Sequence, residues 1–200
     1  MDEIEKYIVL FKKAKQNKQI LHIPNMFSIV PTWNQFINNL NYKFNTKKTT
    51  PIEDFRLHND VLIYNKLDPV VLNLIDKDNN TFNIPQVLSN LNILNNIFQQ
   101  KSSSTKALLN FVGNENSYYI HADDHDVVSW HCIGQMEWRV YPDLELDLNQ
   151  PPPTKVNSNY VSYFLNPGDL LFCPKGIIHQ VLTLEPRASI IYDFHLGENN

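Results

Sequence analysis

The sequence predicts a mainly β fold, a closed or sandwich-like barrel preceded by helices. From Thr105 onward, short runs of β-forming residues alternate with turns that contain glycine or proline, which is typical of such barrels. The 200 residues include only five glycines, and four of them lie at these turns, where a glycine backbone is needed. The N-terminal part instead carries apolar residues at helical spacing.

The segment before the barrel is expected to contain amphipathic helices and short strands. Apolar residues recur every three or four positions at Ile4, Tyr7, Ile8 and Phe11, which indicates a first helix. Runs of β-branched and aromatic residues between turn residues indicate strands. In order, we expect a helix at 2–17, a strand at 20–23, a helix from the N-cap Thr32 through Leu40, a loop at 41–59, strands at 61–64 and 70–75, and a helix capped by Asn83 that carries Val87 to Phe98.

The barrel itself is expected to contain eight strands. Each is a short apolar or alternating run that ends at a glycine, proline or aspartate turn. The three consecutive prolines Pro151–Pro153 provide no backbone donors and predict an extended surface loop between the fourth and fifth strands. The expected strands are 106–112, 118–123, 127–133, 137–141, 160–165, 170–173, 179–184 and 189–194.

The size of the chain predicts one domain over residues 1–200. A hydrophobic content of 42% is sufficient for a substantial core, and barrels of this length are commonly single domains. We expect residues 1–104 to buttress the barrel and residues 105–200 to form its core strands.

Composition also limits the classes of function. A net charge of −4 argues against general nucleic-acid binding. The acidic start Met-Asp-Glu-Ile-Glu does not resemble a secretory leader, and no apolar run reaches membrane-spanning length, so a soluble, intracellular (cytoplasmic) protein is expected. Cys132 and Cys173 lie in expected strands and are predicted to be buried free thiols.

A candidate metal site is formed by His121, Asp123 and His179. In an extended strand, residues separated by one position face the same side, so His121 and Asp123 can point together into a barrel. His179 would join them from a later strand. Two imidazoles and one carboxylate can occupy one face of an octahedral metal and leave the other face open, which is the ligand set of non-haem Fe(II) oxygenases.

Two longer patterns carry a family resemblance. The spacing Gly168-x5-Pro-x-Gly-x2-His179 resembles the second cupin motif. The segment from His121-x-Asp123 to Trp138-Arg-x-Tyr141 resembles the JmjC-like cupin hydroxylases. This resemblance implies a double-stranded β-helix, also called a cupin or jelly-roll barrel, that binds Fe(II) and uses 2-oxoglutarate as cosubstrate. An ordinary metal cupin would instead have a His-x-His pair followed by a glutamate.

The resemblance also implies a cation for the distal carboxylate of 2-oxoglutarate. The family commonly has a lysine where this chain has Met136, which cannot supply a charge-assisted bond. Arg187 and Ser189 resemble the Arg-x-Ser pair with which other 2-oxoglutarate oxygenases hold this carboxylate, and a guanidinium fork suits it. Tyr118 and His131 are further candidates for cosubstrate contact, with core packing as the open alternative for both.

The sequence thus predicts an Fe(II)- and 2-oxoglutarate-dependent dioxygenase that uses O2 to hydroxylate a protein side chain or a small metabolite. Two alternatives stay open: a metal-binding cupin enzyme that does not use 2-oxoglutarate, which Met136 would fit, and a catalytically silent cupin binding protein. The oligomeric state is not predicted. His125, in an Asp-rich bend, is interpreted as a solvated turn residue, with the replacement of a metal ligand or contact with substrate as the open alternative.

Overall fold

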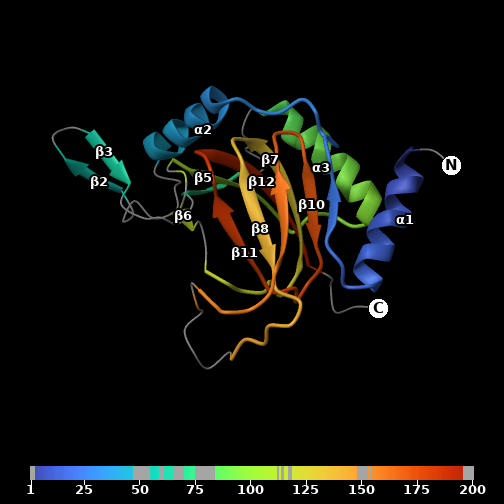
Figure 1. Ribbon diagram of the computed structural model, residues 1–200. Coiled ribbons are helices and arrows are strands. Elements are labelled where there is room, and N and C mark those ends of the chain that lie inside the picture. Colours follow the sequence, from blue (N-terminus) through green and yellow to red (C-terminus); the bar gives the residue numbers. More distant parts are fainter. Residues whose placement is uncertain are drawn as a thin grey trace.

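Two facing antiparallel β-sheets form the centre of the molecule, and helices pack on the outer face of the larger sheet (Figure 1). The computed structural model describes residues 3–46, 55–58, 61–64, 70–74, 84–111, 113, 115–116, 119–147, 153 and 155–195.

The larger sheet has six strands, and every neighbouring pair is antiparallel. Its two longest strands are at the centre and supply much of the wall of the barrel. In spatial order the strands are β1 (Leu21–Ile23), β10 (Leu170–Cys173), β7 (Asp126–Ile133), β12 (Arg187–Phe194), β5 (Ser104–Asn110) and β4 (Val70–Asn73).

The smaller sheet faces it with four strands, which in spatial order are β6 (Glu115–Asn116), β11 (His179–Thr183), β8 (Met136–Val140) and β9 (Val161–Leu165). Along the chain, the strands from β7 to β12 pass from one sheet to the other and back. This arrangement confirms the predicted mainly β fold, a double-stranded β-helix with N-terminal helices. A separate hairpin pairs β2 (Phe55–His58) with β3 (Val61–Tyr64).

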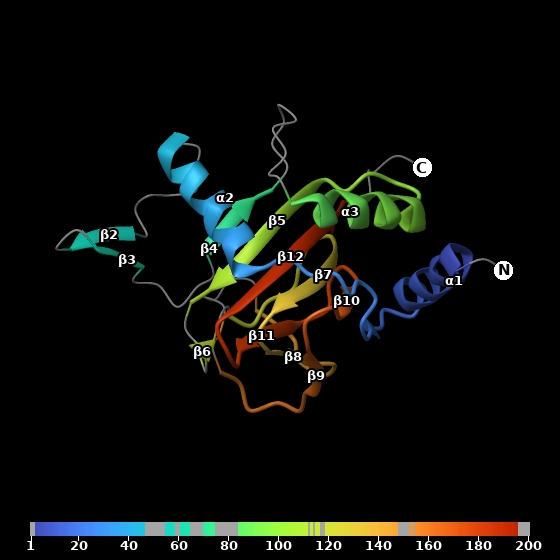
Figure 2. The ribbon, with the colours of Figure 1, turned by 90° about the horizontal axis from the view of Figure 1, so that it is seen from above.

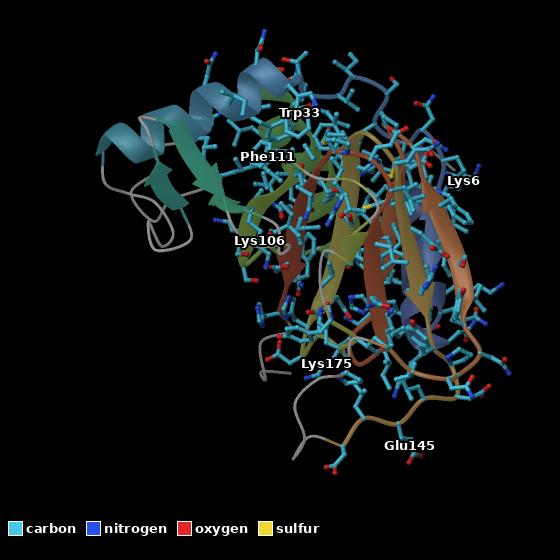
Figure 3. All side chains as sticks on the ribbon, turned by 60° about the vertical axis from the view of Figure 1, so that its left-hand side comes forward. Lys6, Trp33, Lys106, Phe111, Glu145 and Lys175 are labelled. Atoms are coloured by element: carbon cyan, nitrogen blue, oxygen red, sulfur yellow. The ribbon has the colours of Figure 1, made fainter. Side chains whose placement is uncertain are left out.

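Within the described residues, three helices accompany the sheets: α1 (Glu3–Gln16), α2 (Trp33–Thr46) and α3 (Pro85–Phe98). Helix α3 lies on the side of β12 and β7 opposite β8 and β11 (Figure 2). The ring of Phe11 on α1 lies 5.1 Å from that of Phe98 and 5.2 Å from that of Phe172 on β10, measured between centroids. Trp33 on α2 stacks on Phe111, just beyond β5, with centroids 5.8 Å apart (Figure 3).

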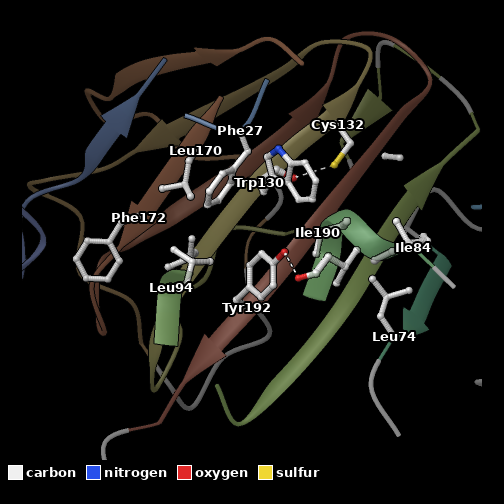
Figure 4. Packing of buried hydrophobic residues seen from close by; sticks show 14 of the residues in the cluster. Phe27, Leu74, Ile84, Leu94, Trp130, Cys132, Leu170, Phe172, Ile190 and Tyr192 are labelled. Atoms are coloured by element: carbon white, nitrogen blue, oxygen red, sulfur yellow. Dashed lines mark hydrogen bonds between the residues drawn. The ribbon is translucent and has the colours of Figure 1, made fainter. Parts of the chain in front are cut away.

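Alternation along the strands divides the core into two clusters. Trp130 and Tyr192 face the helices, and the Tyr192 hydroxyl donates to the Val87 carbonyl of α3 at 3.4 Å (Figure 4). Their neighbours on the other face contribute to a second cluster between the sheets, which includes Trp138 and Ile191. His121, Asp123, His179 and Arg187 line a pocket in this space between the two sheets.

Several boundaries differ from the sequence prediction. The predicted loop at 41–59 was wrong at both ends, because α2 continues to Thr46 and residues 55–58 form β2. Thr32 caps α2 as predicted: its hydroxyl accepts from the Gln35 amide at 3.4 Å, and the Gln35 side chain accepts from the Thr32 amide at 2.9 Å.

The prediction that Asn83 caps α3 was also wrong. The N-cap residue is Ile84, which makes no side-chain cap bond, and Pro85 follows it within the first turn. Proline fixes the backbone angle that a helix requires there and has no amide hydrogen to satisfy, so the helix can begin without a polar cap. Asn83 itself lies outside the described residues.

The predicted strand at 118–123 is not a strand over its described part, residues 119–123. Only His121 pairs, in an isolated bridge with His179. The carbonyl of Asp123 instead accepts from the Gly176 amide of a loop at 2.9 Å. The ladder therefore ends at His121, and the backbone bends at Asp124 and His125.

Gly134, in the turn from β7 to β8, is required by both its backbone angle and its surroundings. Its φ is +75°, and an added Cβ would lie 2.3 Å from the Pro186 carbonyl oxygen. Gly134→Ala is expected to destabilise the protein by more than about 2 kcal/mol. Gly176→Ala is the matched control, because the φ of Gly176 is also positive, at +83°, but an added Cβ would meet no other part of the structure within 4 Å. This substitution should cost only about 1–2 kcal/mol of stability. Equal midpoints in urea denaturation would contradict this account.

Both cysteines are buried free thiols, as predicted. In the described part of the chain, no helix combines the length and the apolar character needed to cross a membrane.

Candidate metal and cosubstrate site

His121, Asp123 and His179 come together at one end of β11. The amide of His121 donates to the His179 carbonyl at 3.0 Å, and the reverse bond is 2.8 Å. Nε2 of His121 lies 3.8 Å from Oδ1 of Asp123, and Nε2 of His179 lies 3.7 Å from Oδ2 of the same carboxylate. One donor atom from each of the three side chains can be chosen so that all lie within 4.8 Å of one another. This spacing fits three ligands of a single metal ion.

Hydrogen bonds fix the orientation of both imidazoles. Nδ1 of His121 donates to the Tyr119 carbonyl, and Nδ1 of His179 donates to the Ile177 carbonyl, each at 2.9 Å. With the proton on Nδ1, each ring presents the lone pair of Nε2 toward Asp123. Burial lowers the pKa of His179 to about 4, so this ring is neutral at physiological pH, as a metal ligand must be. Trp138 stacks on it, with centroids 4.7 Å apart.

A pocket of about 290 Å³ opens beside these three residues. Apolar side chains from both sheets make up part of its wall, including Leu108, Val127 and Val181. Polar groups also line it, mainly from the larger sheet: Lys106, Ser129, Arg187 and Asp193. The pocket therefore offers a metal ligand set, a cation and hydrogen-bonding groups in one partly apolar space.

Arg187 lies in the wall of this pocket although it is only 2% exposed. Its guanidinium donates to Ser189 Oγ at 3.0 Å, to Thr183 Oγ1 at 3.3 Å and to Met136 Sδ at 3.2 Å. Burial lowers the pKa of Arg187 to about 10, so the group remains charged at neutral pH. Met136, at the position where the family commonly has lysine, is thus in direct contact with an arginine from β12.

His131 and Ser189 lie behind Arg187, and neither lines the pocket. Ser189 accepts from Arg187 and, with its hydroxyl proton, donates to Nδ1 of His131 at 3.1 Å. Nε2 of His131 in turn donates to the Gly134 carbonyl at 2.9 Å. The structure therefore places both residues in a hydrogen-bonded chain that positions Arg187. Tyr118 lies outside the described residues.

The burial of His131 in this hydrogen-bonded chain makes the stability of the protein depend on pH. Burial lowers the pKa of His131 to about 4, below its ordinary value of 6.5, so the unfolded chain binds the proton more readily than the folded protein. The contribution of the neutral His131 to the free energy of unfolding is fully present above about pH 6.5 and is lost as the pH falls toward 4. Between about pH 7.5 and about pH 5, we expect urea denaturation to show a loss about 2 kcal/mol greater for the wild type than for His131→Gln. Parallel losses in the two proteins would contradict this assignment.

The sequence did not indicate two polar atoms in the pocket region, Ser129 Oγ and Trp138 Nε1. Both atoms are buried, and within the described residues neither has a hydrogen-bond partner. Buried polar atoms without partners are uncommon and call for a ligand or water to satisfy them. The only available signal was the serine inside the apolar run of β7, whose inward direction could not be read without the strand register.

Comparisons with known proteins agree with this geometry. A profile of the JmjC domain matches residues 84–200. The chain is 38% identical over 85 residues to the bifunctional lysine-specific demethylase and histidyl-hydroxylase NO66 of Dictyostelium discoideum, covering 38% of this chain and 15% of the relative. It is 32% identical over 79 residues to ribosomal oxygenase 2 of Rattus norvegicus, covering 38% of this chain and 16% of the relative. The chain therefore spans less than a fifth of these curated relatives.

Solved structures show the same fold. The X-ray structure of Escherichia coli ycfD superimposes with a TM-score of 0.63 at 13% identity, over 100% of this chain and 54% of that chain. A second structure of that ribosomal oxygenase, with cobalt and succinic acid, gives a TM-score of 0.58 at 12% identity, over 94% of this chain and 52% of that chain. Because the family profile covers more than half of the sequence and the fold is the one that it requires, the chain belongs to the JmjC domain family.

Proposed function

We propose that this protein is an Fe(II)- and 2-oxoglutarate-dependent oxygenase. One observation supports the proposal above all others: the His121, Asp123 and His179 side chains and the Arg187 guanidinium line a single pocket. A metal ligand set with an open face and a buried cation are what a chelating keto acid with a distal carboxylate needs. The JmjC domain family, whose members include Fe(II)/2-oxoglutarate oxygenases, supports the same function.

The donor set fits iron. His121 and His179 each offer Nε2, and Asp123 offers a carboxylate oxygen, so two nitrogens and one oxygen would hold the ion from one side. Carbonyl groups of the backbone hold both rings in the required tautomer. Bound Fe(II) would supply the oxidative chemistry that couples decarboxylation of 2-oxoglutarate to hydroxylation.

The remaining residues bind and orient the cosubstrate. Arg187 would form charge-assisted bonds with the distal carboxylate, in the role that lysine commonly fills in the family. The chain through Ser189 and His131 to the Gly134 carbonyl fixes the guanidinium before the cosubstrate arrives. Leu108 and Val181 also line the pocket, and these apolar side chains would exclude water from the bound cosubstrate.

A protein side chain is the better-supported substrate class. One relative is named a lysine-specific demethylase and histidyl-hydroxylase, and the other is named a ribosomal oxygenase. A small metabolite is the alternative outcome. Incubation with tryptic peptides of ribosomal proteins and with a mixture of free amino acids, followed by mass spectrometry for the gain of one oxygen atom, separates the two classes.

Succinate formation from 2-oxoglutarate tests the proposal itself. With Fe(II), O2 and 2-oxoglutarate, the protein should release succinate, and N-oxalylglycine should inhibit the reaction by competition. The Asp123→Ala variant is the control for trace iron in solution. Fe(II) binding without 2-oxoglutarate binding would favour the metal cupin that does not use 2-oxoglutarate. Absence of both would favour a binding protein without activity.

A further inference from the structure

Asp124, His125 and His195 form a second group of metal-ligating side chains near the rim of the pocket. One donor atom from each can be chosen so that all three lie within 4.8 Å of one another. His125 belongs to the bend after the first ligand pair and lines the pocket, whereas His195 directly follows β12. The two imidazoles stack with their centroids 4.2 Å apart and their planes at 26°.

His125 is less exposed than a solvated turn residue would be, because its side chain is only 14% exposed. Its Nε2 lies 3.2 Å from Oδ1 of Asp193, a carboxylate that is only 3% exposed. Within the described residues this carboxylate oxygen accepts no hydrogen bond, so His125 is within ion-pair distance of a buried and otherwise unsatisfied oxygen. In metal sites the second nitrogen of a ligating histidine commonly faces a carboxylate in this way. Asp193 is itself held through its second oxygen by Lys106 at 2.8 Å and by Ser104.

The other nitrogen of His125 points toward the remaining candidate ligands. Nδ1 lies 2.6 Å from Oδ1 of Asp124, a hydrogen-bonding distance, so a proton lies between them. A divalent ion would displace this proton and separate the two atoms. The side chain of Asp124 is 83% exposed and has the freedom to rotate. His195 is exposed as well, and would supply the second nitrogen.

We infer that Asp124, His125 and His195 form a second metal site, with Asp193 as the carboxylate that orients His125. Two imidazoles and one carboxylate suit Zn²⁺, with water completing a tetrahedron. The site uses none of the three residues proposed to hold iron, so the inference goes beyond the proposed function and does not depend on it. Through His125 and Asp193, it would be in contact with the wall of the cosubstrate pocket.

Calorimetric titration of the metal-free full chain with Zn²⁺ tests this inference. We expect His195→Ala, whose exposed side chain can be removed without disturbing the core, to bind one equivalent of Zn²⁺ fewer than the wild type. The wild type should bind two equivalents if the proposed iron site also accepts Zn²⁺. His22→Ala is the matched control. His22 also pairs with a carboxylate, Asp169, at 3.1 Å, but among the described residues it belongs to neither group of candidate metal ligands. It should behave like the wild type.

The position of Asp193 gives a second readout. Asp193→Asn should keep the three ligands but weaken Zn²⁺ binding at this site by about 10- to 100-fold. If His195→Ala binds Zn²⁺ with the stoichiometry and affinity of the wild type, the inference is overturned.

Failure of the iron site would appear differently. In that case Asp123→Ala would retain every equivalent that the wild type binds, while His195→Ala would still lose one. The proposed function would then lose its support, and the second site would keep its own.

Discussion

Replacing Asp123 with alanine should abolish 2-oxoglutarate turnover and weaken metal binding at the proposed iron site by more than about 100-fold. A ligand lost from the metal itself should cost at least as much as the loss of a residue that only orients a ligand, which is about 10- to 100-fold. The physical reason is that Asp123 supplies the carboxylate that faces Nε2 of both His121 and His179. Titration with Mn²⁺, followed by electron paramagnetic resonance, measures the affinity without oxidation.

An exposed aspartate outside the pocket provides the control for this experiment. Asp143 lies in the turn after β8 and does not line the pocket, so Asp143→Ala should bind Mn²⁺ and turn over 2-oxoglutarate like the wild type. Undiminished turnover in Asp123→Ala would remove the three-ligand site from the account.

Replacing Arg187 with methionine should reduce the affinity for 2-oxoglutarate by about 10- to 150-fold, which corresponds to a charged hydrogen bond worth about 1.5–3 kcal/mol. Methionine keeps most of the buried volume but removes the charge that would face the carboxylate. Metal binding should stay unchanged, because Arg187 is not one of the three proposed ligands. The dissociation constant for 2-oxoglutarate, measured by calorimetry in the presence of Mn²⁺, tests the prediction.

Arg187→Lys separates loss of charge from loss of shape. Lysine should recover part of the affinity, because it restores the charge without the planar fork that donates to Ser189 and Thr183. If the methionine variant binds 2-oxoglutarate as tightly as the wild type, another cation holds the carboxylate. Lys106 is then the first candidate, because its side chain also lines the pocket.

The parts of the fold with strong local patterns could be predicted from the sequence. Helix α1 follows from apolar residues at helical spacing, and α2 begins at the capping residue Thr32 as expected. The later strands follow from apolar runs between glycine and proline turns. Other features depend on partners elsewhere in the chain or on a proline. β2 exists because residues 55–58 pair with β3, and α3 begins at Pro85, which takes the place of a polar cap.

In the candidate site, too, some residues could be predicted from local sequence motifs and others could not. His121, Asp123 and His179 could be selected from motifs, although His121 and Asp123 lie where the ladder ends rather than along the predicted strand. The pocket-facing positions of Ser129 and Asp193 could not be predicted, because the direction of a side chain depends on strand register and a shift of one residue reverses it. His125 lies in a bend, and its closeness to the buried Asp193 depends on how β12 packs beside that bend, which the local sequence does not indicate.

The structure also supports a proposal about domain organisation. We propose that residues 1–200 form one cooperative unit in which the N-terminal segment buttresses the barrel. The main apolar cluster combines Phe11 of α1 and Leu94 of α3 with Trp130 and Phe172 of the larger sheet. A single unfolding transition, seen alike by circular dichroism and by tryptophan fluorescence, is the expected result.

The most direct test of the central claim is a crystal structure of the protein with Mn²⁺ and 2-oxoglutarate bound. The account predicts one ion bonded to Nε2 of His121, to Nε2 of His179 and to a carboxylate oxygen of Asp123. It also predicts the distal carboxylate of 2-oxoglutarate against the guanidinium of Arg187. A 2-oxoglutarate molecule bound away from Arg187, or no ion among the three ligands, would contradict it.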